Sequence, residues 1–188
     1  MNPVGLIYFV LAVIGLIIVW ASVRCLFKRL KCWLSIRRLC RRTGLRLHAR
    51  PLWFLGSRYW KGIDFTLEGP DTVFSVKLFG CFWPLKTLVL QSRGEYFFRA
   101  HAAFLMHILD VFDGYPHTFP EYRFPEPGVK QQRNILLINP SPLDMLLQPS
   151  NGPECITGAG DMYRGMEIAS LPHLLRIAEN AARDDRSA

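Results

Sequence analysis

Histidine and cysteine are the residue types in this chain that most readily bind metals or do redox chemistry, and there are five of each. His101 and His107 are six residues apart, so they lie on different faces of a helix, and no other histidine pair has metal-ligand spacing. No C-x-x-C pair occurs, which leaves a zinc site or a dithiol redox motif without support. These residues therefore predict no bound metal and no cofactor.

A glycine-rich segment at 158–165, GAGDMYRG, has the composition of loops that cradle phosphate. Such a loop needs a helix that begins at its last glycine, so that backbone amides and the helix dipole meet the phosphate. The residues after Gly165 have the pattern of a strand. The segment therefore predicts a tight turn.

The segment GIDFTLEGPDTVFSVKLFG, residues 62–80, resembles the core hairpin of the restriction-endonuclease-like superfamily, which includes nuclease-related domains that follow a membrane anchor. In that family, an Asp on one strand and a Glu-x-Lys or Asp-x-Lys on the next bind a divalent metal and orient a water molecule. The resemblance assigns Asp64 or Asp71 to the first position and Lys77 to the lysine. Ser75 stands where the second carboxylate belongs, and a neutral hydroxyl is a poor ligand for a hard cation.

This resemblance implies a membrane-tethered nuclease-like domain with Mg²⁺ as its cofactor, and the missing carboxylate implies a catalytically degenerate one. The same residues also fit an ordinary amphipathic hairpin, in which alternate side chains of 72–79 face a core. Both interpretations place these side chains on two neighbouring strands.

Strands are indicated by short runs rich in β-branched and aromatic residues, separated by turn signals. The runs are 45–49, 63–67, 72–79, 86–92, 95–99 and 134–138, with weaker candidates at 144–148 and 165–170. The simplest arrangement of the early runs is a meander of three or four strands.

Two helices are expected in the same part of the chain. Residues 100–113 have apolar side chains at helical spacing, and residues 170–185 form a closing helix with Ser170 as its N-cap. Residues 114–128 contain four prolines, which exclude a regular helix, so a proline-rich connector is expected there.

The amino-terminal segment Val4–Val23 carries no charge and has the length of a membrane span, because twenty residues of helix reach about 30 Å. A cleaved signal peptide needs a basic start and a shorter apolar run. Tyr8 and Trp20 lie near opposite ends of the segment, where aromatic rings favour the headgroup region. Gly5 and Gly15 are too far apart for the small-residue dimer motif, so this motif gives no argument for pairing of spans.

Residues 24–42 hold eight basic residues and no acidic one. Basic residues beside a span are retained on the cytoplasmic side, so they predict an amino terminus outside and everything after residue 24 inside. Five of them recur along one helix face and are expected to bind anionic headgroups: Arg24, Lys28, Lys31, Arg38 and Arg42. The apolar residues of the same helix gather on another face: Leu26, Phe27, Leu30, Trp33, Leu34 and Cys40. A solvated neck that only sets the orientation is the alternative.

The charge of +8 is unevenly distributed. Residues 1–63 contain 12 basic residues and no acid, whereas the rest of the chain has 11 basic and all 15 acidic residues. Charge concentrated beside an apolar segment indicates a membrane surface, and makes nucleic acid an unlikely partner.

Together these patterns predict an α+β protein in three parts: a transmembrane anchor (1–23), a basic amphipathic juxtamembrane helix (24–43) and a cytoplasmic domain (44–188). The domain is expected to hold a small mixed or antiparallel sheet with two helices. The expected function is that of an interaction or scaffold module at the inner membrane surface, with the lipid bilayer and a protein as partners and no enzymatic activity. The alternative is the degenerate nuclease-like domain.

Overall fold

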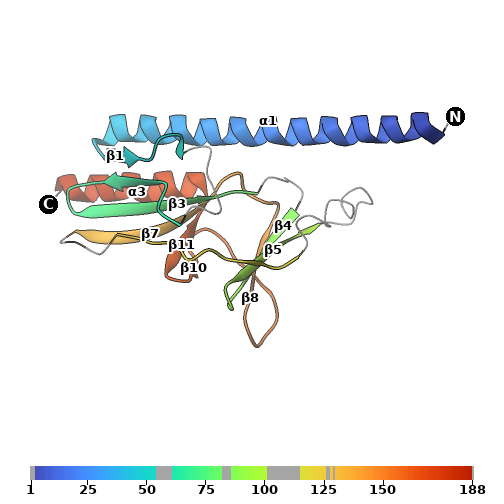
Figure 1. Cartoon of the computed structure of the whole chain (residues 1–188). Helices are drawn as coiled ribbons and strands as arrows, with labels where there is room; N and C mark the ends of the chain where they lie inside the picture. Colours follow the sequence, from blue (N-terminus) through green and yellow to red (C-terminus); the bar gives the residue numbers. More distant parts are fainter. Residues whose placement is uncertain are drawn as a thin grey trace.

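The computed structural model describes residues 3–53, 61–81, 86–100, 115–125, 128 and 130–187. It begins with a single helix, α1 (Pro3–Thr43), whose 41 residues correspond to about 60 Å. This helix includes the predicted anchor and the predicted basic helix without a break (Figure 1). It ends at Thr43, as predicted, because Gly44 takes a φ of 82° and its amide donates to the Cys40 carbonyl.

The strands after α1 form two sheets. The first is mixed and has the order β1 (Arg46–Ala49), β2 (Phe65–Glu68), β3 (Thr72–Phe79), β7 (Gln131–Ile138), β11 (Met166–Ala169), β10 (Met162–Tyr163). The second has the order β6 (His117–Thr118), β5 (Glu95–Ala100), β4 (Lys86–Gln91), β8 (Met145–Gln148), β9 (Cys155–Ile156). The chain closes with α3 (Leu171–Ser187). The protein is thus broadly α+β.

The predicted strands form, but they do not make one meander. β3 pairs in parallel with β7 along its whole length, from Thr72 opposite Gln131 to Phe79 opposite Ile138. After each of these two strands the chain passes into the second sheet, where β4 and β8 are again parallel. The strands therefore form two sheets and not the expected one. Each sheet is held together by a parallel pairing between segments far apart in the sequence, β3 with β7 and β4 with β8.

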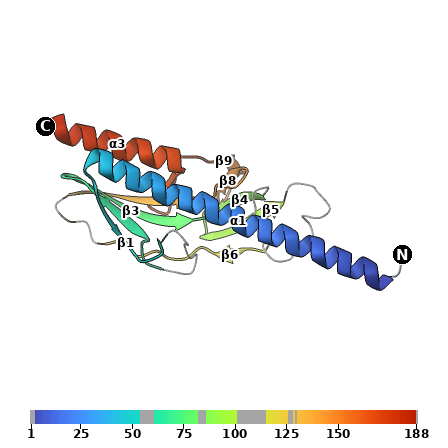
Figure 2. The ribbon, with the colours of Figure 1, turned by 90° about the horizontal axis from the view of Figure 1, so that it is seen from above.

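α1 and α3 lie side by side over one face of the first sheet (Figure 2). α1 contributes Cys32, Ile36 and Leu39 to this core, at the spacing of one helix face. α3 contributes Leu174, Ala178 and Ala182. The first turn of α3 is capped as predicted, since the His173 amide donates to Ser170 Oγ. Each fully buried large apolar side chain stabilises the fold by about 1.5–3 kcal/mol.

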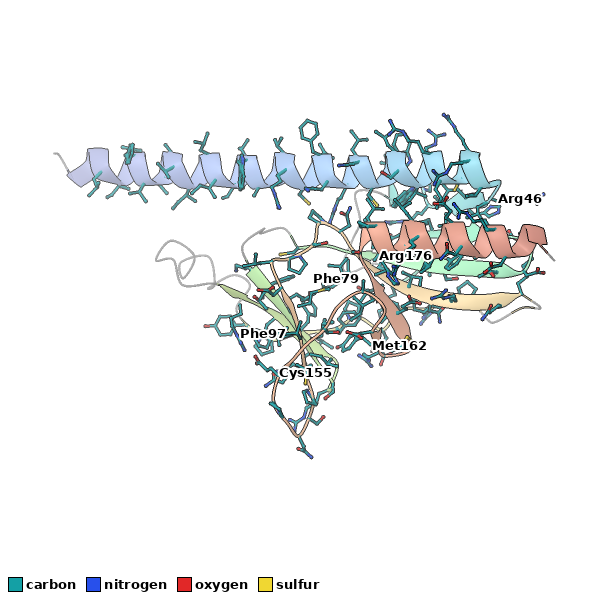
Figure 3. All side chains as sticks on the ribbon, turned by 180° about the vertical axis from the view of Figure 1, so that it is seen from behind. Arg46, Phe79, Phe97, Cys155, Met162 and Arg176 are labelled. Carbon is teal, nitrogen blue, oxygen red and sulfur yellow. The ribbon has the colours of Figure 1, made fainter. Side chains whose placement is uncertain are left out.

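The opposite face of the first sheet packs partly on the second sheet. Phe79 and Leu136 meet Leu88 and Phe98 in this second core, and Phe79 lies between the sheets in Figure 3. The helix predicted at 100–113 lies outside the described residues, except that Ala100 ends β5. The connector expected at 114–128 contains the short strand β6.

Candidate functional site

The amino-terminal half of α1 has its apolar side chains exposed. Leu6, Leu11 and Leu16 are examples, and this half extends past the sheets (Figure 1). In the part of the chain that the structure describes, one helix is long and apolar enough to cross a membrane, judged by length and composition. A single N-terminal helix could therefore span a bilayer.

The carboxyl-terminal half of α1 packs on the domain through one face. The residues covered there run from Ala21 and Cys25 to Cys32, Ile36 and Leu39. Contact continues through the backbone, since the Asn139 side chain donates to the Lys28 carbonyl over 3.3 Å. The domain therefore lies against α1 from the end of the apolar segment onward.

The predicted headgroup-binding residues lie mostly away from this contact. Lys28, Lys31, Arg38 and Arg42 are exposed, whereas Arg24 is partly covered. Arg42 also forms an ion pair of 2.8 Å with Glu179 of α3. The structure thus leaves at least three cations accessible along the outer side of the helix.

The face that contacts the domain was recognised only in part in the sequence. Of the predicted apolar face, Trp33 and Cys40 pack partly on the domain core, whereas the leucines and Phe27 remain exposed. Cys32 and Ile36, which were not predicted, are fully buried. The spacing of Cys25, Cys32, Ile36 and Leu39 was available as a signal, because free cysteine behaves as a small hydrophobic residue and is often buried. Burial raises the pKa of the Cys32 thiol to about 12, so this thiol stays protonated at neutral pH.

Asp64 and Lys77, which the family resemblance singles out, are in direct contact. Lys77 Nζ lies 3.1 Å from Asp64 Oδ2, and both side chains have no exposed surface. The Leu78 amide donates to the same oxygen, and Arg50 donates to Oδ1 over 3.0 Å. Desolvation lowers the pKa of Lys77 despite the opposing attraction of Asp64.

This arrangement does not fit a Mg²⁺ site. The Asp64 oxygens already accept three hydrogen bonds from Lys77, Leu78 and Arg50, and two of these donors are cations. A Mg²⁺ ion would have to displace them in a place with no access from solvent. Among the described residues, no group of three His, Cys, Asp or Glu side chains could hold a metal ion.

Asp71, the other candidate for the acidic position, is not part of this cluster. It lies in the turn before β3 and is six residues from Lys77, which is about 20 Å along a strand. Ser75 is fully buried, and its hydroxyl has no hydrogen-bond partner among the described residues. The hairpin therefore brings one Asp and one Lys together without a second carboxylate.

Residues Phe119–Pro125, here called the strap, run across the face of the first sheet that carries Lys77, which is the face turned away from α1 and α3. The Arg123 amide donates to the Lys61 carbonyl, and Gln132 of β7 donates to the Pro125 carbonyl. The Tyr122 ring lies 4.9 Å from Lys77 Nζ, a cation–π contact. The strap thus helps to cover the buried ion pair.

A pocket of about 260 Å³ opens between the strap and the hairpin of β10 and β11. Asn134, Arg164 and Met166 line it together with the rings of the strap. Ligand pockets are usually about 300–1,000 Å³. The pocket is small, and Glu121 and Arg164 place charges of both signs in its wall, so its chemistry indicates no ligand class.

A second charged cluster, not foreseen from the sequence, lies on the helix side of the first sheet. Glu167 accepts from Arg133 and contacts His173 Nε2 at 2.9 Å. Burial would raise the pKa of Glu167, but the hydrogen bonds from His173 and Arg133 together lower it. The cluster ties β7, β11 and α3 together, and its members are too far apart in sequence to form a visible motif.

The glycine-rich segment forms turns, as predicted. Asp161 accepts from the Gly158 amide and the Thr157 hydroxyl, and these bonds lower its pKa. Arg164 and Gly165 then make a two-residue hairpin loop, with φ of 49° and 76°. A strand follows, so this segment lacks the helix start that a phosphate loop requires.

The buried charges of the domain therefore support its fold, and the exposed surfaces of α1 are the strongest candidates for function. No protein-family model matches this chain, and no match is found among the curated proteins or among the solved structures.

Proposed function

We propose that this chain is a single-pass membrane protein whose amino terminus lies outside and whose cytoplasmic domain is an interaction or scaffold module at the inner membrane surface. One observation carries the proposal: the helix that is apolar enough to span a bilayer is also part of the domain core. The domain is then held at the membrane without a flexible linker.

The lengths support this placement. A hydrocarbon core of about 30 Å takes about 20 residues of helix, which is the segment Val4–Val23. The domain begins to cover α1 at Ala21, in the last turn of that segment, so it would begin at the inner boundary of the hydrocarbon core. Lys28 and Lys31 are exposed within about 12 Å of Val23 along the helix and can bind anionic lipid, at about 1 kcal/mol for each residue close to the surface, whereas Arg38 lies about 22 Å beyond Val23.

The protein partner is proposed to bind on the side of the domain that faces away from α1. Ile156 is 88 % exposed and Met162 is also exposed, on edge strands of the second and first sheet respectively. Figure 3 shows Cys155 and Met162 on the side opposite to α1. Exposed apolar residues on sheet edges are suited to contact with another protein.

Membrane topology tests the anchoring. A reporter at the carboxyl terminus should be active inside the cell, and the protein should resist both salt and alkaline washes of isolated membranes. Release by alkali, or a carboxyl terminus outside, would refute the proposed anchoring and orientation.

Photo-crosslinking tests the scaffold role. A photoreactive amino acid at Ile156 should give a defined adduct with a second protein in membranes, whereas the same amino acid at the exposed Asp184 of α3 should give none. Identical adducts at both positions, or adducts with lipid alone, would argue against a partner on this surface.

A further inference from the structure

A stripe of apolar side chains on α1 faces away from the domain. Its members recur at spacings of 4, 3, 4, 3 and 4 residues, and each is between 37 % and 71 % exposed. We call this stripe the seam; it consists of Leu16, Trp20, Val23, Phe27, Leu30 and Leu34.

The spacing of the seam averages 3.5 residues, which is the repeat of two helices in a left-handed coiled coil. With the seam at the a and d positions of the heptad, Cys25, Cys32 and Leu39 fall at f and Ile36 at c. These residues are buried against the domain, as is Ala21 at b, while Trp33 and Cys40 at g are partly buried against it. The domain therefore occupies the back of the helix, and in the view from above no described element passes over α1 (Figure 2).

The seam continues beyond the proposed membrane span. Lipid can cover Leu16, Trp20 and Val23, but Phe27, Leu30 and Leu34 follow the span on a helix that is otherwise strongly basic. Large apolar side chains exposed in a row indicate a contact surface. A second helix aligned with the first would cover all six residues along one continuous line.

The charges beside the seam are compatible with a parallel pair. Basic residues stand at e positions (Lys31, Arg38) and apolar residues at g positions (Leu26, Trp33). In a parallel coiled coil, each g side chain meets the e side chain five residues later in the partner. Lys31 would meet Leu26, and Arg38 would meet Trp33, so no base faces a base at these contacts.

We propose that α1 pairs in parallel with a second copy of this chain through the seam, with the two domains on the outer sides of the helix pair. The pairing ends after Leu34, because Arg37 and Arg41 occupy the next d and a positions. This inference rests on the proposed membrane anchoring, which inserts both copies in the same direction.

Disulfide crosslinking in isolated membranes tests the pairing. Leu30→Cys and Leu34→Cys should give several-fold more disulfide-linked dimer under mild oxidation than Lys28→Cys, which is exposed at the same depth but at a b position. The wild-type chain gives the background from its own cysteines, of which Cys155 is exposed. Equal crosslinking at positions 28 and 30 would overturn the proposal.

Energy transfer between two differently labelled copies in vesicles gives an independent measurement. Leu30→Glu should reduce the transfer to the level of a non-interacting membrane protein, while the unfolding midpoint of the domain stays unchanged. Transfer that persists in Leu30→Glu, or that is absent in the wild type, would overturn the pairing. Alkali resistance of the same membranes separates the two ideas: a resistant monomer refutes only the pairing, whereas alkaline release refutes the anchoring.

Discussion

The two faces of β3 are stabilised in different ways. Phe74, Val76 and Leu78 point toward α1 and α3 and are held by apolar contacts. Ser75 and Lys77 point to the opposite side, where Asp64 neutralises a fully buried ammonium group. Apolar packing tolerates substitutions of similar volume, whereas a buried ion pair holds only while both charges are present. The helix side of this strand should therefore accept apolar residues of similar volume, whereas the position of Lys77 on the other side should not accept the loss of one charge of its ion pair.

Removal of one charge from the polar side should have the largest effect. Asp64→Asn leaves Lys77 and Arg50 without their counter-charge, and we expect the free energy of unfolding to fall by about 3–5 kcal/mol. Denaturant unfolding followed by tryptophan fluorescence measures this loss. Asp71→Asn is the matched control, with an expected change within about 0.5 kcal/mol.

The same pair offers a sharper form of the test. A double variant, Asp64→Leu with Lys77→Met, removes both charges, and it should be more stable than Asp64→Asn alone. If Asp64→Asn and Asp71→Asn proved equally mild, the ion pair would not stabilise this face.

On the helix side, Ile36→Ala should cost about 2–5 kcal/mol, because it leaves a cavity between α1 and the sheet. Leu11→Ala removes an equally large side chain from the exposed half of α1 and should leave domain unfolding unchanged. Unfolding of both variants in the same detergent makes the comparison. An equal loss for both would mean that α1 is not part of the domain core.

Acid should weaken the helix side through Glu167. Its pKa is lowered below 4.5 in the folded state, so its stabilising effect is complete above 4.5 and is lost as the pH falls through the folded value. The free energy of unfolding should therefore decrease with falling pH in this range, and less steeply in Glu167→Gln. If the free energy of unfolding fell equally steeply with pH in the wild type and in Glu167→Gln, Glu167 would not be the group responsible.

The smallest effect is expected at Ser75. Its buried hydroxyl has no partner among the described residues, and such a group costs free energy in the folded state. Ser75→Ala should therefore leave stability unchanged or raise it by up to about 1 kcal/mol. A loss above about 1 kcal/mol in the same unfolding assay would reveal a partner for the hydroxyl.

Local features of the fold could be predicted because their signals are local. The alternation of Phe74, Val76 and Leu78 with polar neighbours indicated β3 at its observed bounds, and Gly44 marked the end of α1. The contact between Asp64 and Lys77 follows from the register of a hairpin, in which the Asp64 amide bonds the Val76 carbonyl.

Features that depend on distant residues could not be predicted. The parallel pairing of β3 with β7 joins positions about sixty residues apart, and no pattern in either strand indicates which strand it will pair with. Arg133 and Glu167 meet through a second long-range pairing, that of β7 with β11, and His173 reaches them from α3. Most of the contact face of α1 was missed because Leu26, Phe27 and Leu30 are larger apolar residues than the cysteines that are buried.

The absence of a break in α1 between its exposed half and Thr43 has a mechanical consequence. Any rotation or axial shift of the amino-terminal half turns or moves the domain by the same amount, because no hinge absorbs the motion. Insertion of one alanine after Val23 would turn the domain by about 100° about the helix axis and move it by about 1.5 Å. Insertion of seven would restore its direction almost completely, at a distance about 10 Å farther along the axis.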